Sequence, residues 1–182
     1  MKVLERLEKL NFWNLNCLQK NRHLKLIGNK SEFAVEYKIS DIPSMMGYGK
    51  LWIQGKFYGT NQDLIYLSGY LVNLIENIAE AKPLRLSIDQ ANYDKIYEQL
   101  KKLSNETSEH LIMSSTFTDD FVGYKFREGQ EVVLVWKIRD DVEMIFDDLK
   151  GYSTSTILVK VKSHIINEVL IKFKDELKKA RA

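Results

Sequence analysis

The chain has 182 residues, of which 45% are hydrophobic and 29% are charged, so it can bury a core and does not resemble a disordered or fibrous protein. Its single cysteine, Cys17, excludes an internal disulfide and favours a reducing compartment. The formal net charge is only +2, but residues 119–149 contain nine acidic and four basic side chains, whereas residues 150–182 contain three and eight. Such asymmetry can steer a charged partner, although solvated faces that interleave in the fold would give the same counts.

Neither the first ten residues nor the most apolar stretch has the pattern of a targeting or membrane segment. Residues 1–10 alternate charged and apolar side chains as in a short amphipathic helix, and they lack the apolar run of a signal peptide. Residues 64–81 are interrupted by polar side chains, which indicates an amphipathic helix and not a membrane span. We therefore expect a cytoplasmic protein that does not bind membranes.

The first strands follow from an alternation of apolar and polar residues. Residues 32–40 and 50–58 both alternate, and the Pro and Gly residues between them predict a loop over 41–49, so the two runs form an antiparallel hairpin. Gly55, inside the second run, predicts a bulge or a close backbone approach. A weaker apolar pattern over 23–28 indicates a further short strand.

The longest helical pattern follows this hairpin. Leucines and isoleucines recur at helical spacing from Leu64 to Ile78, which predicts a helix over 61–81. Thr60 is suited to cap its first turn, with Asp63 completing an acidic capping box, and Pro83 ends it.

The second half of the chain predicts short strands and two more helices. Strands are expected over 84–88, 111–113 and 156–162, and helices over 93–103 and from Ser163, which we interpret as a helix cap, toward the C-terminus. Residues 121–126 and 132–138 form the clearest hairpin, joined by a polar loop over 127–130. Because residues 132–138 are apolar at nearly every position, that strand should be central and covered on both faces.

This order of elements predicts an α+β fold. We expect a single domain over 1–182, built from a mostly antiparallel sheet of about six to seven strands with three to four packed helices.

No set of residues has the spacing of a catalytic, cofactor or metal site. None of His23, His110 and His164 lies three or four residues from another histidine or from Cys17, so they do not form a metal-ligand pattern. Each is best explained as a surface or hydrogen-bonded side chain. Cys17 is best explained as a small buried hydrophobe. We expect a protein that is not an enzyme, has no cofactor and makes no direct contact with nucleic acid.

The acidic run over 140–148 is the most suggestive surface. Its carboxylates bracket the apolar residues 144–146, and a charged rim around an apolar patch is typical of protein-binding surfaces. A solvated loop is the alternative. The partner-binding residues that we predict are those of this run together with two aspartates just before the 121–126 strand: Asp119, Asp120, Asp140, Asp141, Glu143, Phe146, Asp147 and Asp148.

Two segments taken together resemble a known family. The strand Phe33-Ala34-Val35-Glu36-Tyr37, followed by Gly49-Lys50-Leu51-Trp52-Ile53-Gln54-Gly55-Lys56 and a long helix, and a late strand ending in Val135-Trp136-Lys137, resemble small bacterial immunity proteins of polymorphic toxin systems, including those of contact-dependent growth inhibition. The pattern covers about half of the chain, and the extra N-terminal helix departs from it.

This resemblance implies a non-enzymatic protein that binds one cognate toxin domain in the cytoplasm and blocks its active site or its access to substrate. It carries over no catalytic residues. Many toxin domains are nucleases with basic clefts, to which an acidic patch is complementary. The residues alone leave two other classes open: a small-ligand-binding or regulatory module with Trp52 or Trp136 in the wall of a cavity, and an uncharacterised enzyme.

Overall fold

The computed structural model describes residues 24–84, 92–141 and 143–182. The helix predicted over 1–10, Cys17, His23 and nearly all of the strand predicted over 84–88 lie outside these residues. In the described part of the chain, no helix is long and apolar enough to cross a membrane.

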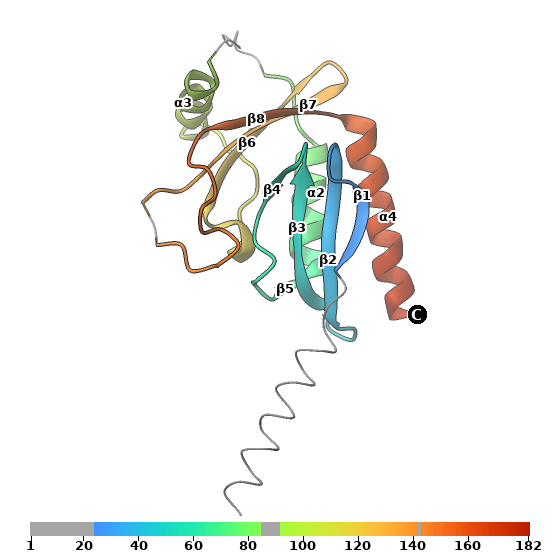
Figure 1. Ribbon diagram of the computed structural model, residues 1–182. Helices are drawn as coiled ribbons and strands as arrows, with labels where there is room; N and C mark the ends of the chain where they lie inside the picture. Colours follow the sequence, from blue (N-terminus) through green and yellow to red (C-terminus); the bar gives the residue numbers. More distant parts are fainter. Residues whose placement is uncertain (1–23, 85–91, 142) are drawn as a thin grey trace, which may run out of the picture.

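The first sheet is antiparallel and has five strands in the order β1-β2-β3-β4, with β5 paired to β3 (Figure 1). Its strands are β1 (Lys25–Asn29), β2 (Phe33–Asp41), β3 (Met46–Ile53), β4 (Lys56–Tyr58) and β5 (Ile65–Tyr66). The predicted alternation is confirmed in β2, where Val35 and Tyr37 are buried while Glu36 between them is only half-buried. One face of β2 therefore lies in the core, and the other carries polar side chains such as Glu36 and Lys38.

The second predicted strand, over 50–58, ends at Tyr58 as predicted, but its start and its continuity were wrong. The structure starts β3 at Met46, inside the predicted loop, and Gly47 and Gly49 belong to the strand. A side chain at either glycine would come within 2.7 Å of Leu67 or Leu71, so these glycines let the following helix approach the sheet closely. The run then breaks at Gln54 and Gly55, which both have positive φ and form the two-residue turn between β3 and β4. Gly55 is thus a turn residue and not a bulge.

The long helix predicted over 61–81 is shorter in the structure and starts at Leu67. Residues 60–64 form a loop, β5 follows, and the helix starts as the π-helical turn η1 (Leu67–Leu71) and continues as α2 (Val72–Ala79). The predicted capping box does not form: the Thr60 hydroxyl donates to Asp148 at 2.6 Å and accepts from the Gln62 backbone nitrogen at 3.1 Å, in a loop that precedes β5. Tertiary contact here outweighs the local capping signal.

The second sheet has three antiparallel strands, β6 (Phe121–Glu128), β7 (Glu131–Ile138) and β8 (Ile157–Lys162), in that order. The predicted hairpin is confirmed, with Phe121 opposite Ile138, but its loop shortens to Gly129 and Gln130. β7 is central and buried on both faces, as its sequence predicts. Residues 111–113 form only an isolated bridge, from Leu111 to Tyr124.

The two faces of β7 face different layers. Val133 and Val135 pack with α3 (Tyr93–Ser104), whose first turn is capped by the side chain of Asn92. Leu134 and Trp136 point into the main core, which also contains Leu51 and Tyr58 of the first sheet. A single hydrophobic core therefore includes side chains from both sheets.

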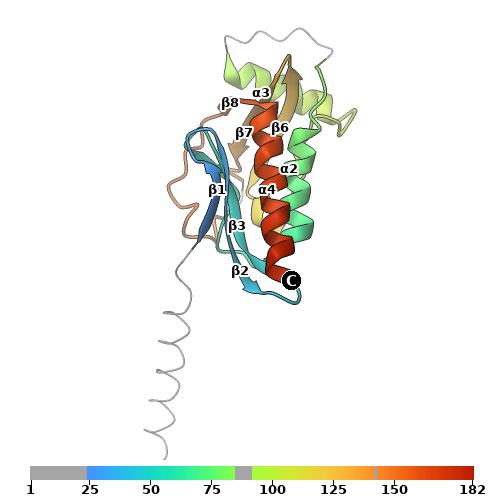
Figure 2. The ribbon, with the colours of Figure 1, turned by 90° about the vertical axis from the view of Figure 1, so that its right-hand side faces the viewer.

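The last helix, α4 (Ser163–Arg181), lies beside α2 over the buried face of the first sheet (Figures 1 and 2). Its predicted apolar stripe is confirmed: Ile166, Val169, Phe173 and Leu177 are buried and Leu170 is half-buried. Ser163 is not the cap that we predicted, because it is the first helical residue and its hydroxyl donates to the Gln130 carbonyl at 2.9 Å.

The α+β class and the antiparallel pairing are confirmed, but the single sheet is wrong. The described residues form two sheets of five and three strands, and the three α-helices are α2, α3 and α4. The sequence could not separate the sheets, because strand periodicity specifies which face of a strand is buried and not which strands become neighbours.

Candidate partner-binding site

The predicted acidic surface divides into two groups, of which the first surrounds Arg139 at the end of β7. The Arg139 guanidinium donates to both carboxylate oxygens of Asp141, at 3.0 and 2.9 Å, and its backbone nitrogen donates to the Asp120 carbonyl at 2.7 Å. Asp119 accepts from the Ser114 hydroxyl at 2.8 Å. Asp140 lies 3.9 Å from the Lys137 ammonium. We call Asp119, Asp120, Asp140 and Asp141 the acidic corner.

The electrostatics of the acidic corner differ from one carboxylate to the next. Partial burial, reinforced by the charge of Asp119, raises the pKa of Asp120, although Arg139 acts in the opposite direction. The hydrogen bonds from Arg139 lower the pKa of Asp141. One arginine therefore faces three carboxylates, which leaves the corner with excess negative charge at neutral pH.

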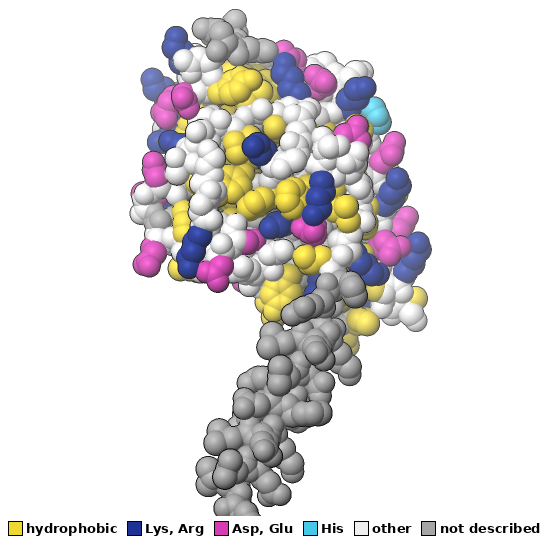
Figure 3. Space-filling model, in the orientation of Figure 1, with side chains coloured by type: hydrophobic (Ala, Val, Ile, Leu, Met, Phe, Trp, Pro, Cys, Tyr) yellow, Lys and Arg dark blue, Asp and Glu magenta, His cyan; other side chains and the backbone are white. Residues whose placement is uncertain are grey.

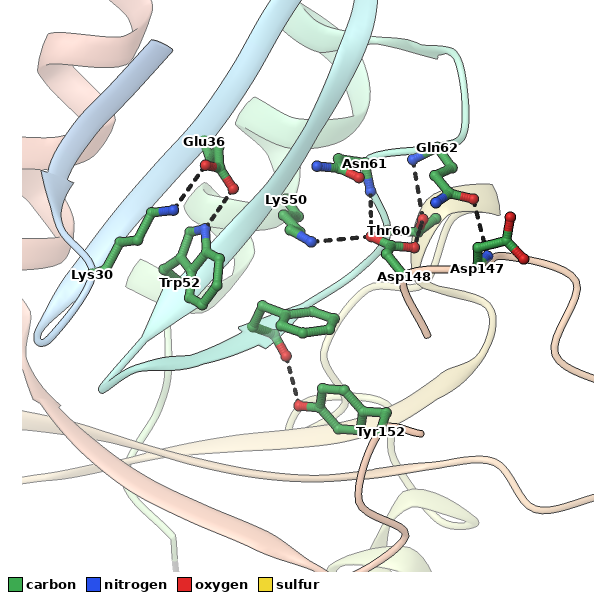
Figure 4. A network of polar contacts seen from close by, with 11 residues as sticks. Lys30, Glu36, Lys50, Trp52, Thr60, Asn61, Gln62, Asp147, Asp148 and Tyr152 are labelled. Carbon is green, nitrogen blue, oxygen red and sulfur yellow. Dashed lines mark hydrogen bonds and ion pairs between the residues drawn. The ribbon is translucent and has the colours of Figure 1, made fainter. Parts of the chain in front are cut away.

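The second group, Asp147 and Asp148, lies against the first sheet (Figure 4). Asp148 is 3.0 Å from the ammonium of Lys50 on β3 and accepts hydrogen bonds from the Thr60 hydroxyl, at 2.6 Å, and the Asn61 backbone nitrogen, at 3.2 Å. Only 7% of the Lys50 side chain and 17% of the Asp148 side chain are exposed. Asp148 therefore anchors its loop to the sheet, with little surface left for a partner.

Asp147 has the opposite environment although it is the preceding residue. Its side chain is exposed and pairs with Lys150 at 2.6 Å, and this contact lowers the pKa of Asp147. Its backbone nitrogen donates to the Gln62 side chain at 3.0 Å, which adds a second tie between the loop and residues 60–62 (Figure 4). Asp147 thus keeps its carboxylate at the surface.

The apolar centre of the predicted surface is only partly available. Met144 and Phe146 pack against the main core, whereas Ile145 is 73% exposed. Glu143 is also exposed. A partner that approaches this loop would meet Ile145 and Glu143, while Phe146, which we predicted to be a contact residue, mainly holds the loop down.

Beside this loop lies a groove that the sequence indicated only weakly. It has a volume of about 570 Å³ and runs between the β3–β4 hairpin and residues 148–157. Its aromatic floor is Trp52, Phe57 and Tyr152, and its rim includes Lys56 and Lys150. Figure 3 shows hydrophobic side chains with interspersed Lys and Arg near the middle of one face of the molecule. We call the groove over Trp52, Phe57 and Tyr152 the aromatic groove.

Hydrogen bonds hold the floor of the aromatic groove in place. The Tyr152 hydroxyl donates to the Phe57 carbonyl at 2.6 Å and accepts from the Trp136 indole nitrogen at 3.0 Å. The Trp52 indole nitrogen donates to Glu36 at 2.8 Å (Figure 4). Burial would raise the pKa of Glu36, but the hydrogen bonds from Lys30 and Trp52 outweigh it and lower the pKa.

The sequence signal for the groove was Trp52 itself, a large aromatic on the polar face of an alternating strand. Of the two tryptophans proposed for the wall of a ligand cavity, Trp52 lines this groove, which no described helix lines, and Trp136 is buried in the core. The contribution of residues 148–157 had no local signal, because it depends on contacts across about a hundred residues of chain.

The two described histidines have different environments. His110 is buried, with its Nδ1 3.2 Å from the Lys125 carbonyl oxygen, and His164 is exposed on the first turn of α4. Over residues 24–84, 92–141 and 143–182, no cluster of three or more His, Cys, Asp or Glu side chains could hold a metal ion.

Comparisons with known proteins agree with one another. The crystal structure of CdiI from Burkholderia dolosa AUO158 superposes with a TM-score of 0.54 and 12% identity, covering 81% of this chain and 99% of that chain, so the two share a fold. No curated protein matches the sequence. The model of the family Immunity protein 42 matches residues 26–176. This range includes most of α4 and all of the described strands except the first residue of β1. The chain therefore belongs to the Immunity protein 42 family.

Proposed function

We propose that this protein neutralises a cognate toxin domain by binding it in the cytoplasm and blocking its active site or its access to substrate. The observation that carries the proposal is the match of residues 26–176 to an immunity protein family. Such a protein works by occupying a surface and not by catalysis.

The acidic corner supports a particular contact face. Asp119, Asp140 and Asp141 are exposed, and the chain continues from them to the exposed Glu143 and Ile145. Carboxylates at the rim of an interface accelerate association with a basic partner, and an apolar side chain beside them adds contact area that slows dissociation. A toxin domain with a basic cleft, such as a nuclease, has the complementary charge.

Charge reversal tests this contact face. We would combine Asp119→Lys, Asp140→Lys and Glu143→Lys and measure binding to the toxin domain encoded beside this gene by surface plasmon resonance. The association rate should fall about tenfold or more at low salt, and the difference should shrink as salt is added. The unfolding midpoint should stay near that of the unmodified protein, because these side chains are exposed.

A matched control carries the same change of charge elsewhere. Glu32→Lys, Glu106→Lys and Asp175→Lys also reverse three exposed carboxylates, at the β1–β2 turn, after α3 and on α4. This control should retain most of the association rate. Equal losses in the two triple variants would assign the effect to net charge and contradict the contact face, and a toxin domain that does not bind the unmodified protein would contradict the function.

A further inference from the structure

The aromatic groove has features of a docking site that the acidic corner lacks. Its floor is built from three aromatic rings in edge-to-face contact, with 5.6 Å between the centroids of Trp52 and Phe57 and 4.8 Å between those of Phe57 and Tyr152. The series continues from Tyr152 to Phe121 at 5.3 Å, inside the core. A floor that is continuous with the core does not have to be ordered when a partner binds.

The cations around this floor are fixed on the inside and available at the rim. The Lys50 ammonium lies 4.1 Å from the centroid of the Phe57 ring and is neutralised by Asp148. Among the described residues that line the groove, Asp148 is the only carboxylate. At the rim, Lys56 is exposed, and Lys150 pairs with the exposed Asp147. Exposed pairs of this kind contribute little, so a partner carboxylate can replace Asp147.

The groove is therefore apolar at its floor and positive at its rim. This combination selects an apolar or aromatic side chain flanked by carboxylates. Aromatic anchors that fill preformed pockets, ringed by polar contacts, are the usual centres of binding energy in protein interfaces. Its volume of about 570 Å³ also suits one large side chain and its neighbours.

We propose that the aromatic groove binds an acidic segment of the toxin domain, with one apolar or aromatic side chain of that segment seated on Trp52, Phe57 and Tyr152. This inference rests on the proposed toxin-neutralising function and names a second contact whose charge is opposite to that of the acidic corner. Two contacts of opposite sign discriminate better than one, because a toxin domain that is merely basic satisfies only the corner.

The first test fills the groove without touching its floor. Ser155 lines the groove and is exposed, so Ser155→Trp should occupy the space of the partner side chain. Its matched control is Ser108→Trp, at an exposed serine before His110. Binding is measured by titration calorimetry of the full chain with the toxin domain encoded beside its gene. Ser155→Trp should raise Kd by about thirtyfold or more, the effect of losing one anchor, and Ser108→Trp should leave Kd within about threefold.

The second test examines charge and the protein's own integrity. Lys56→Glu with Lys150→Glu should raise Kd by about tenfold and should make the remaining binding less sensitive to salt. Lys162→Glu with Lys178→Glu, two exposed lysines at the end of β8 and on α4, is the control and should have little effect. Circular dichroism and the unfolding midpoint identify any variant that fails to fold. Such a variant is replaced by the single substitutions Lys56→Glu and Lys150→Glu, each compared with the unmodified protein.

The outcomes separate this inference from the function on which it rests. If the toxin domain binds the unmodified protein and the groove variants equally well, the groove is not a contact and only this inference fails. If the toxin domain does not bind the unmodified protein, the proposed function fails. Recovery of a small molecule from the purified protein, lost in Ser155→Trp, would also overturn the inference, since the occupant would then be a ligand and not a protein segment.

Discussion

The two sheets each bury one lysine, and they do so in different ways. Lys50 of the first sheet faces the Asp148 carboxylate at 3.0 Å. Lys125 of the second sheet is 3% exposed, and its ammonium donates to two neutral oxygens, the Asn77 side-chain oxygen at 2.6 Å and the Leu111 carbonyl at 2.8 Å. Burial lowers the pKa of Lys125 to about 8, with Glu80 acting weakly in the opposite direction. The first lysine is thus paired directly with a carboxylate, whereas the second hydrogen-bonds to neutral oxygens.

This difference shows how the same residue type joins different parts of one core. The Lys50–Asp148 contact fastens residues 143–155 to the first sheet and forms one wall of the aromatic groove. Lys125 joins β6 to Asn77 of α2 and to Leu111, in the segment that precedes β6. We expect removal of Asp148 to leave the Lys50 ammonium buried without a counter-charge, whereas neutralising Lys125 removes a buried charge that has no directly paired carboxylate.

The largest effect should follow Asp148→Ala. The substitution leaves the Lys50 ammonium buried without its carboxylate and the Thr60 hydroxyl and Asn61 nitrogen without their acceptor. The free energy of unfolding should fall by about 3 kcal/mol in urea denaturation at pH 7. Asp148→Asn, which keeps an acceptor for Thr60, should lose less. A loss no greater than that of Asp147→Ala would show that Lys50 does not depend on this partner.

A second effect, on the order of 2 kcal/mol, should appear as a pH dependence from Lys125. Its pKa is about 8 in the folded protein and lies near 10.5 when unfolded, so between these values the unfolded chain binds more protons. Stability should therefore rise as the pH goes from 8 to 10, relative to Lys125→Met. The comparison with Lys125→Met also cancels the buried tyrosines, whose raised pKa values act in the opposite direction above pH 10.

The control for this pH dependence is an exposed lysine. Lys162→Met removes an ammonium from the surface at the end of β8, so its stability difference from the unmodified protein should not change over the same pH range. A flat difference for Lys125→Met as well would show that the buried ammonium does not lose its proton more easily in the folded protein.

A smaller effect, about 1 to 2 kcal/mol, is expected for Tyr152→Phe, which removes an uncharged tie at the same wall as Asp148. The change leaves the Phe57 carbonyl and the Trp136 indole nitrogen without the hydroxyl that joins them. Thermal unfolding should show the loss, and Tyr93→Phe, at an exposed tyrosine, should not. A loss as large as that of Asp148→Ala would mean that hydrogen bonding, and not charge, holds the wall of the groove.

The smallest effect is expected for Asp147→Ala. Its exposed pair with Lys150 should contribute nothing measurable to stability, so the unfolding midpoint should be unchanged. Because the substitution frees Lys150 at the rim of the aromatic groove, it should preserve or strengthen binding of the toxin domain. Clear destabilisation would contradict the view that Asp148 stabilises the fold and its neighbour Asp147 does not.

Much of the fold was readable from the sequence because its signals are local. Alternation predicted the buried face of β2, the apolar run 132–138 predicted a central strand, and helical spacing predicted the stripe of α4. The predictions failed where a distant residue intervened. Thr60 has the sequence of a helix cap, but it bonds to Asp148, 88 residues away, and the helix starts later.

The sequence by itself determined the buried face of β2, the burial of β7 and the apolar stripe of α4, and it placed the chain near bacterial immunity proteins, a resemblance that the family match confirms. Only the tertiary structure decided how the acidic residues divide. Asp148 became an internal anchor, Asp140 and Asp141 stayed exposed, and Trp52 acquired a groove with residues 148–157. The physical reason is that hydrophobic periodicity acts within one element, whereas pairing a charge or lining a groove requires groups from segments 80 to 100 residues apart.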